Sequence, residues 1–288
     1  VKAMQGKKMP QIGEIDIQVM EEGQSRWLSF IKDEVDLFAL DGELTVQALQ
    51  DGKLKPELVK KGVQLSRITD PSIDYHYWNM QNPVVGGLSK DKIALRRAMA
   101  MAFSADNYIN ILQKGDAQKL QAPIPSGVVG YDPNYRSSIP YSVKAANLLL
   151  DRYHSKVAAD GWRTQPNGKP LVIEMTLSGN NLRSQQQAEF WKKTLDSIKI
   201  RMTTKSMPFA EALKLEKQCK TMLNASAWIA DYPDADNFMQ LFYGKNIKIT
   251  NNGCVKIPEY DRLYEQAQKM TPSPERDAIY AKMSRMLE

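Results

Sequence analysis

The stretch TMLNASAWIADYPDADNF, residues 221–238, predicts the end of a β-strand followed by a turn. Residues 221–229 are mostly small or apolar and contain one Trp, which favours an extended conformation. Pro233 cannot donate to a sheet ladder, and it restricts Tyr232 to non-helical angles, so the strand has to end before it. Asp231 therefore lies at the carboxyl end of the strand, where open α/β sheets bind their ligands.

The residues after this turn predict a short helix. Asp236 and Asn237 are favourable N-capping residues, and Phe238, Leu241 and Phe242 follow them at helical spacing.

Asp231 and the aromatic residue three positions before it, Trp228, form a candidate clamp for a ligand with a positive charge and an apolar part. An alternative is that Asp231 satisfies the amides of its own turn and that Trp228 packs in the core. The residues alone leave both open. A calcium site made by Asp231, Asp234 and Asp236 is disfavoured, because the spacing lacks the alternating acids, central Gly and distal Glu of a helix-loop-helix calcium loop. No metal and no cofactor is expected.

The chain before this stretch alternates between strands and helices. Strands are predicted at 171–177, 200–204 and 222–229, and amphipathic helices at 184–198 and 209–217. This order implies a doubly wound, mainly parallel sheet with right-handed crossovers. Two more helices are predicted at 259–269 and 274–287.

The earlier part of the chain predicts a less regular arrangement. The expected strands are 12–20, 35–40 and 75–80, and the expected helices are 24–31, two short ones within 43–61 broken near Pro56, one starting at Lys90, 106–113, and one starting after Ser142. A Pro/Gly-rich passage, residues 122–140, is too irregular for regular structure.

Composition limits the class of protein. With 288 residues, 42% hydrophobic and 25% charged, the chain can form about two soluble globular domains. No apolar run approaches the roughly 18 residues of a membrane helix. The net charge of +6 comes from basic residues spread along the chain. Because a nucleic-acid footprint needs basic residues clustered on one face, no nucleic-acid partner is expected.

Catalytic motifs are absent from the sequence: there is no G-x-S-x-G elbow, Walker loop, G-x-G-x-x-G or H-E-x-x-H. The two histidines, His76 and His154, lie in unrelated segments. We therefore expect a binding protein and not an enzyme. A hydrolase that uses Cys219 or Cys254 is the enzyme alternative.

Cys219 and Cys254 flank the candidate site and would close a 36-residue segment (219 to 254 inclusive). A bridge there would stabilise the protein by about 3 kcal/mol in the chain-entropy model. Two buried free thiols are the alternative, and the residues alone leave both open.

Four groups of residues, in order along the chain, carry a likeness to a known family. They are EVDL at 34–37; YWNM at 77–80 with LRRAMA at 95–100 and AD at 105–106; PIPSG at 123–127 with 141–150; and WIADYPD at 228–234 with NN at 251–252, YD at 260–261 and ER at 275–276. On these residues the chain resembles the C-terminal portion of the family 5 extracellular solute-binding proteins, the periplasmic peptide- or oligopeptide-binding components of bacterial ABC transporters.

The resemblance implies an α/β fold of the type II periplasmic binding protein kind. It implies one largely complete lobe with a doubly wound, mainly parallel sheet plus a remnant of the other lobe. Residues 1–76 would be the remnant of lobe I, and residues 77–288 would be lobe II, truncated before its return to lobe I. Tyr77 and Asn79 would then belong to the hinge about which the lobes close.

The resemblance also implies a function in the periplasm: capturing di- or oligopeptides and delivering them to the membrane permease. The acid at Asp231 would pair with the peptide's α-ammonium, while Trp228 and the backbone from Ala227 to Ile229 would line the site by strand addition. The family often has Gly where this chain has Ala227. The same fold with a metal chelate, sugar or opine as its solute is the alternative.

Two further expectations follow from the resemblance. An oxidising periplasm favours a Cys219–Cys254 disulfide. A complete site needs both lobes, so this chain is expected to bind peptide weakly or not at all.

Overall fold

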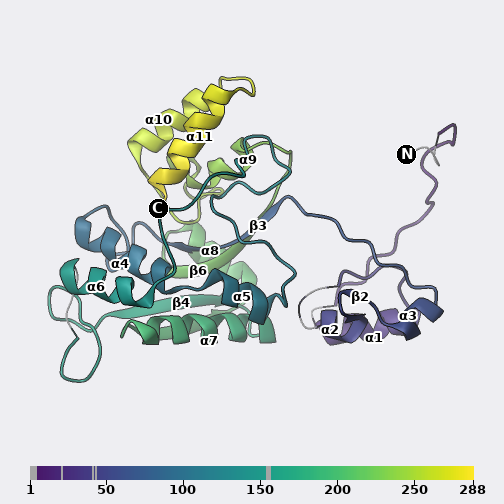
Figure 1. The fold of residues 1–288 in the computed structure, drawn as a ribbon, viewed down its shortest axis with the longest axis horizontal. Helices are drawn as coiled ribbons and strands as arrows, with labels where there is room; N and C mark the ends of the chain where they lie inside the picture. Colours follow the sequence, from purple (N-terminus) through teal and green to yellow (C-terminus); the bar gives the residue numbers. More distant parts are fainter. Residues whose placement is uncertain (1–4, 21, 41, 43, 154–156) are drawn as a thin grey trace. The chain divides into compact units, whose positions relative to one another are not determined.

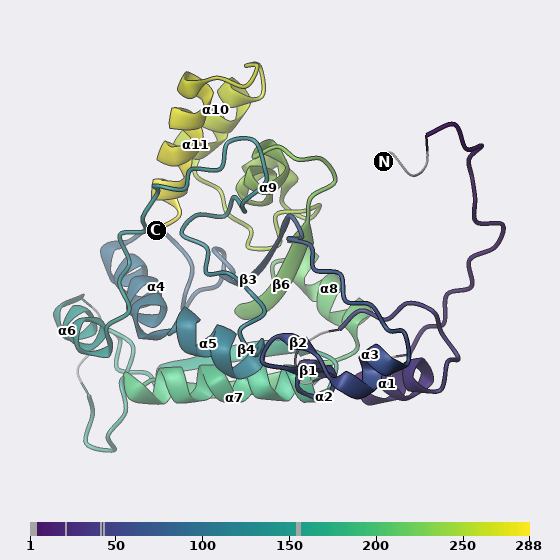
Figure 2. The same cartoon turned by 45° about the vertical axis from the view of Figure 1, so that its right-hand side comes forward.

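The computed structural model of the protein describes residues 5–20, 22–40, 42, 44–153 and 157–288. The chain divides into two compact units, Val1–Gly62 and Val63–Glu288. We call them the N-terminal unit and the main unit; their elements are labelled in Figures 1 and 2. The boundary that we expected between residues 76 and 77 falls inside a strand of the main unit, β3 (Ser72–Trp78).

The N-terminal unit is built from short elements. They are α1 (Gly23–Ile31), α2 (Leu44–Ala48), β1 (Leu49–Gln50), β2 (Lys53–Leu54) and α3 (Pro56–Lys60). The predicted helix 24–31 is present, and two short helices flank a small hairpin. Pro56 starts the second of these helices, because its missing N–H costs nothing in the first turn.

The two strands predicted in this unit, 12–20 and 35–40, are wrong. Residues 12–20 pair with no other described segment, and Ile15, Ile17 and Val19 are between 73% and 90% exposed. Alternation predicts a strand only where a partner strand supplies the ladder. In the second segment Phe38 packs against the rings of Trp27 and Phe30 on α1, which accounts for its apolar character.

The main unit contains a four-stranded sheet in the order β3-β6-β4-β5. Its other strands are β4 (Val172–Ser178), β5 (Arg201–Met207) and β6 (Leu223–Ile229). β4 runs parallel to β5 and to β6, whereas β3 runs antiparallel to β6 over seven residue pairs. The predicted doubly wound, mainly parallel sheet is confirmed, and β3 adds an antiparallel edge to it.

Two crossover helices make the sheet doubly wound. α7 (Leu182–Ser197) leads from β4 to its neighbour β5, and α8 (Phe209–Lys217) leads back past β4 to β6. Because the two connections move in opposite directions and crossovers are right-handed, the two helices have to lie on opposite faces. Figure 2 shows α7 lying along the sheet beside α5 (Ala105–Leu112).

Two apolar clusters form the core of the main unit. The first joins the sheet to α4 (Lys90–Ala102), α6 (Val143–Tyr153) and α7, and its fully buried members include Leu95, Leu150, Met175, Leu195 and Leu223. The second surrounds the chain that follows β6, with α9 (Asp236–Met239), α10 (Pro258–Ala267) and α11 (Pro274–Met286). Two 3₁₀ turns, Gln240–Phe242 and Gly244–Asn246, link α9 to α10.

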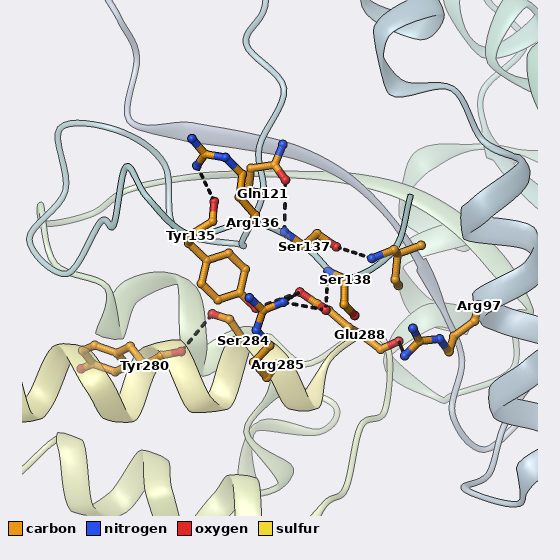
Figure 3. A network of polar contacts seen from close by, with 11 residues as sticks. Arg97, Gln121, Tyr135, Arg136, Ser137, Ser138, Tyr280, Ser284, Arg285 and Glu288 are labelled. Atoms are coloured by element: carbon orange, nitrogen blue, oxygen red, sulfur yellow. Dashed lines mark hydrogen bonds and ion pairs between the residues drawn. The ribbon is translucent and has the colours of Figure 1, made fainter. Parts of the chain in front are cut away.

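A polar network ties the Pro/Gly-rich passage to the end of α11 (Figure 3). The Glu288 carboxylate accepts hydrogen bonds from the Tyr135 hydroxyl and the Ser138 amide, each at 2.8 Å. Arg285 donates to the same carboxylate at 3.1 Å while its guanidinium lies 4.3 Å from the centre of the Tyr135 ring. The irregular passage is therefore held by side chains, since it has no ladder of its own.

Candidate functional site

The candidate site begins where β6 separates from β4. The two strands share a single register pair, Met175 with Leu223, after which no described residue of one strand pairs with the other. The chain reverses its direction of winding between these strands, and open α/β sheets bind ligands outside the carboxyl ends of the strands at such a reversal. A cavity of about 210 Å³ lies at the separation, lined by Met175–Ser178, Ala225–Ala227, Asp74, Tyr75, His76, Tyr108, Arg183, Ser184 and Gln187.

The separation leaves one edge of β6 unpaired. Just beyond the ends of the β3–β6 pairing, the Asn79 amide donates to the carbonyl of Met222, and the Ala230 amide donates to the carbonyl of Pro71. By the alternation of an antiparallel ladder, the even-numbered residues of β6 direct their backbone groups toward β3. The N–H and C=O groups of Ala225, Ala227 and Ile229 therefore point the other way, toward the gap.

The predicted ligand-binding residues of β6 lie on two faces of the sheet. Ala227 pairs with Asp74 of β3, and Trp228 pairs with Ile73. Because successive side chains of a strand point to opposite faces, the side chains of Ala227 and Trp228 lie on opposite faces of the sheet. Ala227 lines the cavity, and Ile229, on the same face, is 61% exposed. Trp228 is partly buried against the second apolar cluster, as the core alternative for it expected.

Asp231 is exposed, and its carboxylate does not bond to the amides of its own turn. Oδ2 accepts a hydrogen bond from Nδ2 of Asn237 at 3.3 Å, and the Asp231 amide donates to Oδ1 of Asn237 at 3.1 Å. The Trp228 indole donates to the same Oδ1 at 2.9 Å. One amide side chain thus brings Asp231 and Trp228 together.

The predicted capping of the short helix is corrected by the structure. Oδ1 of Asp234 accepts from the Asp236 amide at 2.9 Å, while the N-cap position of α9 is Ala235. Asp236 instead accepts a hydrogen bond from the Tyr232 hydroxyl, and Asn237 is fully buried. The amides of Phe238 and Met239, which a cap at Asp236 would have accepted, donate instead to the backbone carbonyl of Ala235.

Sequence reasoning missed Asn237 as a site residue and assigned no role to Arg276. Arg276 donates from both terminal nitrogens to the Asp234 carboxylate and from Nη2 to the Tyr280 hydroxyl. The backbone of Val129 forms an isolated bridge with Asp234. The loop that carries Asp231 is therefore fixed from α11 and from the Pro/Gly-rich passage. Nothing local in the sequence distinguishes Asn237 from an ordinary capping residue.

Charged and aromatic side chains surround the cavity. Asp74 accepts from Arg183 at 3.2 Å and from Gln113 at 3.3 Å. His76 packs against Phe103, Tyr108 and Trp191 with ring centroids 5.3 to 5.4 Å apart, and burial lowers the pKa of His76 to about 4. His154 lies outside the described residues. Within the described residues, no group of three or more His, Cys, Asp or Glu is placed to hold a metal ion.

The two predicted hinge residues are buried at the end of β3. Nδ2 of Asn79 donates to the carbonyls of Cys219 and Thr221 at 2.6 and 2.7 Å. Tyr77 is 7% exposed, and its pKa is raised by burial and by the nearby Glu216 carboxylate. Asn79 therefore fixes the end of β3 to the segment before β6.

The predicted disulfide is confirmed: Cys219 and Cys254 are bonded, with their Cα atoms 6.1 Å apart. The bridge joins the residues just before β6 to the segment after the 3₁₀ turns. It closes the chain segment that carries Trp228, Asp231 and Asn237.

A larger cavity, of about 480 Å³, lies elsewhere in the main unit. It is lined by parts of 119–136 and by α11 residues that include Asp277 and Ser284, and it contains none of the predicted site residues. In the part of the chain that the structure describes, no helix is long and apolar enough to cross a membrane.

Comparison with known proteins identifies relatives over most of the chain. The "Di/tripeptide-binding protein 2" of Pseudomonas aeruginosa is 26% identical over an alignment of 208 residues that covers 68% of this chain and 35% of that protein. The oligopeptide-binding protein OppA of Bacillus subtilis is 22% identical over 278 residues, 96% of this chain and 48% of that protein. The chain thus spans about half, or less, of the length of these curated relatives.

Solved structures share the fold. The periplasmic binding protein DppA of Helicobacter pylori, in complex with peptide STSA, has a TM-score of 0.71 at 22% identity, over 94% of this chain and 48% of that one. NikA of Brucella suis, in complex with Fe(III)-EDTA, has a TM-score of 0.72 at 20% identity, over 94% and 53% of the two chains. These similarities establish the expected fold of the periplasmic binding proteins.

The family itself is established by a match to a family model over most of the chain. The model of the family described as "Bacterial extracellular solute-binding proteins, family 5 Middle" matches residues 4–249. The chain therefore belongs to the family 5 bacterial extracellular solute-binding proteins.

Proposed function

We propose that this chain belongs to the substrate-binding component of a bacterial ABC importer, which captures peptides in the periplasm and delivers them to a membrane permease. Residues 1–76 would be a remnant of lobe I and 77–288 most of lobe II, with Tyr77 and Asn79 at the hinge. The protein would hold its ligand and not transform it.

The observation that carries this proposal is the unpaired edge of β6 leading to an exposed acid. The backbone groups of Ala227 and Ile229 are free of β3 by the register, and Asp231 follows them directly along the chain. An extended peptide can pair with such an edge through its own backbone, which tolerates varied side chains. Its α-ammonium would pair with the Asp231 carboxylate.

This arrangement also sets the direction of the peptide. Since the unpaired edge precedes Asp231, a peptide whose amino end lies at Asp231 would run antiparallel to β6. Its later residues would reach the 210 Å³ cavity beside Ala225 and Ala227. The relatives named as di/tripeptide- and oligopeptide-binding proteins support this ligand class.

A titration with trialanine tests the proposal. Nuclear magnetic resonance of the ¹⁵N-labelled chain measures even millimolar dissociation constants, which suits a chain with one largely complete lobe. We expect saturable shifts at Ala225, Ala227 and Ile229. Asp231→Ala or N-acetylation of the peptide should weaken binding by about fivefold or more, the scale of one charge-assisted contact at an exposed site.

The matched control is Asp196→Ala, which removes a partly buried acid at the far end of α7, away from the carboxyl ends of the strands. It should leave the affinity unchanged. If Asp231→Ala binds trialanine as tightly as the wild type does, peptide capture through Asp231 is wrong.

The second candidate is the same fold with a metal chelate as its solute. The similarity to NikA in complex with Fe(III)-EDTA supports it. This candidate would be favoured if the chain bound Fe(III)-EDTA saturably and did not bind trialanine.

A further inference from the structure

Asn237 is a neutral residue without any exposed surface, at the start of a four-residue helix. Three hydrogen bonds of its side-chain amide go to Trp228 and Asp231, and the same amide also interacts with the Tyr232 hydroxyl. Oδ1 accepts from the Trp228 indole at 2.9 Å and from the Asp231 backbone amide at 3.1 Å, while Nδ2 donates to Oδ2 of Asp231 at 3.3 Å.

The orientation of this amide follows from the chemistry of its partners. An indole N–H and a backbone N–H can only donate, so the oxygen of Asn237 has to face them. The nitrogen then faces the carboxylate, which can only accept when ionised. The reversed amide would oppose donor to donor twice and acceptor to acceptor once, so the contacts determine a single arrangement.

The consequence for Asp231 is that one carboxylate oxygen is fixed and the other is left for a ligand. Asn237 holds both the backbone amide of Asp231 and its Oδ2, which fixes the side chain relative to the end of β6. Among the described residues, none donates a hydrogen bond to Oδ1 of Asp231. An exposed carboxylate without this support would sample several rotamers, and a ligand would have to restrict them on binding.

Asn237 is itself held from outside the site. Its backbone amide donates to the carbonyl of Asp234 at 3.0 Å, and the Asp234 carboxylate is paired with Arg276 on α11. The position of the amide is therefore set before any ligand arrives.

We propose that Asn237 is a positioning residue for peptide recognition: it orients the Asp231 carboxylate toward the peptide's α-ammonium and holds the Trp228 indole beside it. This inference rests on the proposed function and adds a residue that does not itself touch the ligand. Asn237 acts through Asp231, so its effect on binding requires that carboxylate.

The test compares Asn237→Ala with Asn251→Ala. Asn251 is the matched control because it is also fully buried and also makes three side-chain hydrogen bonds, to Tyr243 and Val255, none of which involves the site. Both variants should lower the melting temperature. Only Asn237→Ala should weaken trialanine binding, by about fivefold, the scale expected for losing a preorganised contact to a charge. Binding of N-acetyl-trialanine should stay unchanged in both variants.

A double-mutant cycle separates positioning from a general structural effect. In the Asp231→Ala background, the further change Asn237→Ala should leave trialanine affinity unaltered, because no carboxylate remains to be oriented. Asn237→Thr, which keeps a polar side chain of similar size, provides the same comparison should the Ala variant fold poorly.

The outcomes are distinct. If Asp231→Ala does not weaken trialanine binding, the proposed function and this inference both fail. If Asp231→Ala weakens binding but the Asn237 variants do not, the function stands and the inference is overturned. Equal losses in the Asn251 control, or additive losses in the cycle, also overturn it.

Discussion

The carboxylate of Asp234 and the guanidinium of Arg276 form a bidentate salt bridge that connects the loop after β6 to α11. Nη1 donates to Oδ2 at 2.9 Å, Nη2 donates to Oδ1, and the two side chains are 21% and 7% exposed. Two charges so far removed from water depend on each other, because the loss of either one leaves its partner uncompensated.

We expect Arg276→Met to lower the free energy of unfolding by about 3 to 5 kcal/mol, the cost of leaving a buried charge without its partner. Urea unfolding followed by circular dichroism measures this change. The control is Arg262→Met, which breaks the ion pair between Arg262 and Glu259. The side chain of Arg262 is 61% exposed and that of Glu259 is 44% exposed. That exposed pair should contribute at most about 1 kcal/mol. If Arg276→Met and Arg262→Met lost similar amounts of unfolding free energy, the stabilising role of the Arg276–Asp234 pair would be contradicted.

His76 should make the protein less stable in mild acid. Its pKa is lowered by burial to about 4 from the usual 6.5, so the unfolded chain binds the proton more tightly than the folded one. The stability linked to His76 is therefore present above pH 6.5 and is lost as the pH falls toward 4, by roughly 3 kcal/mol in all.

His76→Phe should remove that part of the pH dependence, because a phenyl ring joins the surrounding rings without titrating. Urea unfolding at pH 4.5 and pH 7 in both proteins gives the difference. An unchanged difference between the two pH values would contradict the linkage.

Glu216 should make the protein less stable as the pH rises, the opposite of the effect of His76. The side chain is 6% exposed, and burial raises its pKa while a contact with Tyr77 partly offsets the rise. The folded state therefore holds the proton more tightly than the unfolded chain. The stability linked to Glu216 is present below the usual pKa of 4.5 and is lost as the pH rises through the higher folded-state value.

Glu216→Gln should consequently be more stable than the wild type at pH 8 and closer to it at pH 4. Glu211→Gln, on the exposed side of the same helix, is the control and should show no such dependence. The linkage would be wrong if Glu216→Gln lost stability at pH 8 by more than at pH 4.

Reduction of the disulfide should destabilise the segment that carries the site. Cys219 and Cys254 are separated by 35 positions, and a loop of that length corresponds to about 3 to 4 kcal/mol in the chain-entropy model. Thermal unfolding with and without dithiothreitol measures the loss. A Cys219→Ser, Cys254→Ser variant should unfold like the reduced protein and should not respond to the reductant. Equal melting temperatures for oxidised and reduced protein would contradict this prediction.

The sequence predicted those parts of the fold that depend on neighbours along the chain. The helix at Phe209–Lys217 has the predicted bounds, since its apolar period and the preceding Pro208 are local signals. The strands predicted at 12–20 and 35–40 were wrong because pairing is a non-local property. The candidate site was predictable only in part. Asp231 could be placed at a strand end, but the meeting of Asn237 with Trp228 depends on how α9 packs against β6, which no periodicity reveals.

Because one edge of β6 is unpaired, the hydrogen-exchange rates of its backbone amides should alternate from residue to residue. The amides of Ser226 and Trp228 are directed at β3 and should exchange slowly, whereas those of Ala227 and Ile229 face the gap and should exchange quickly. Neighbouring residues of one strand would thus differ in protection with a period of two. A ligand that completes the sheet would slow the fast set and leave the slow set as it was.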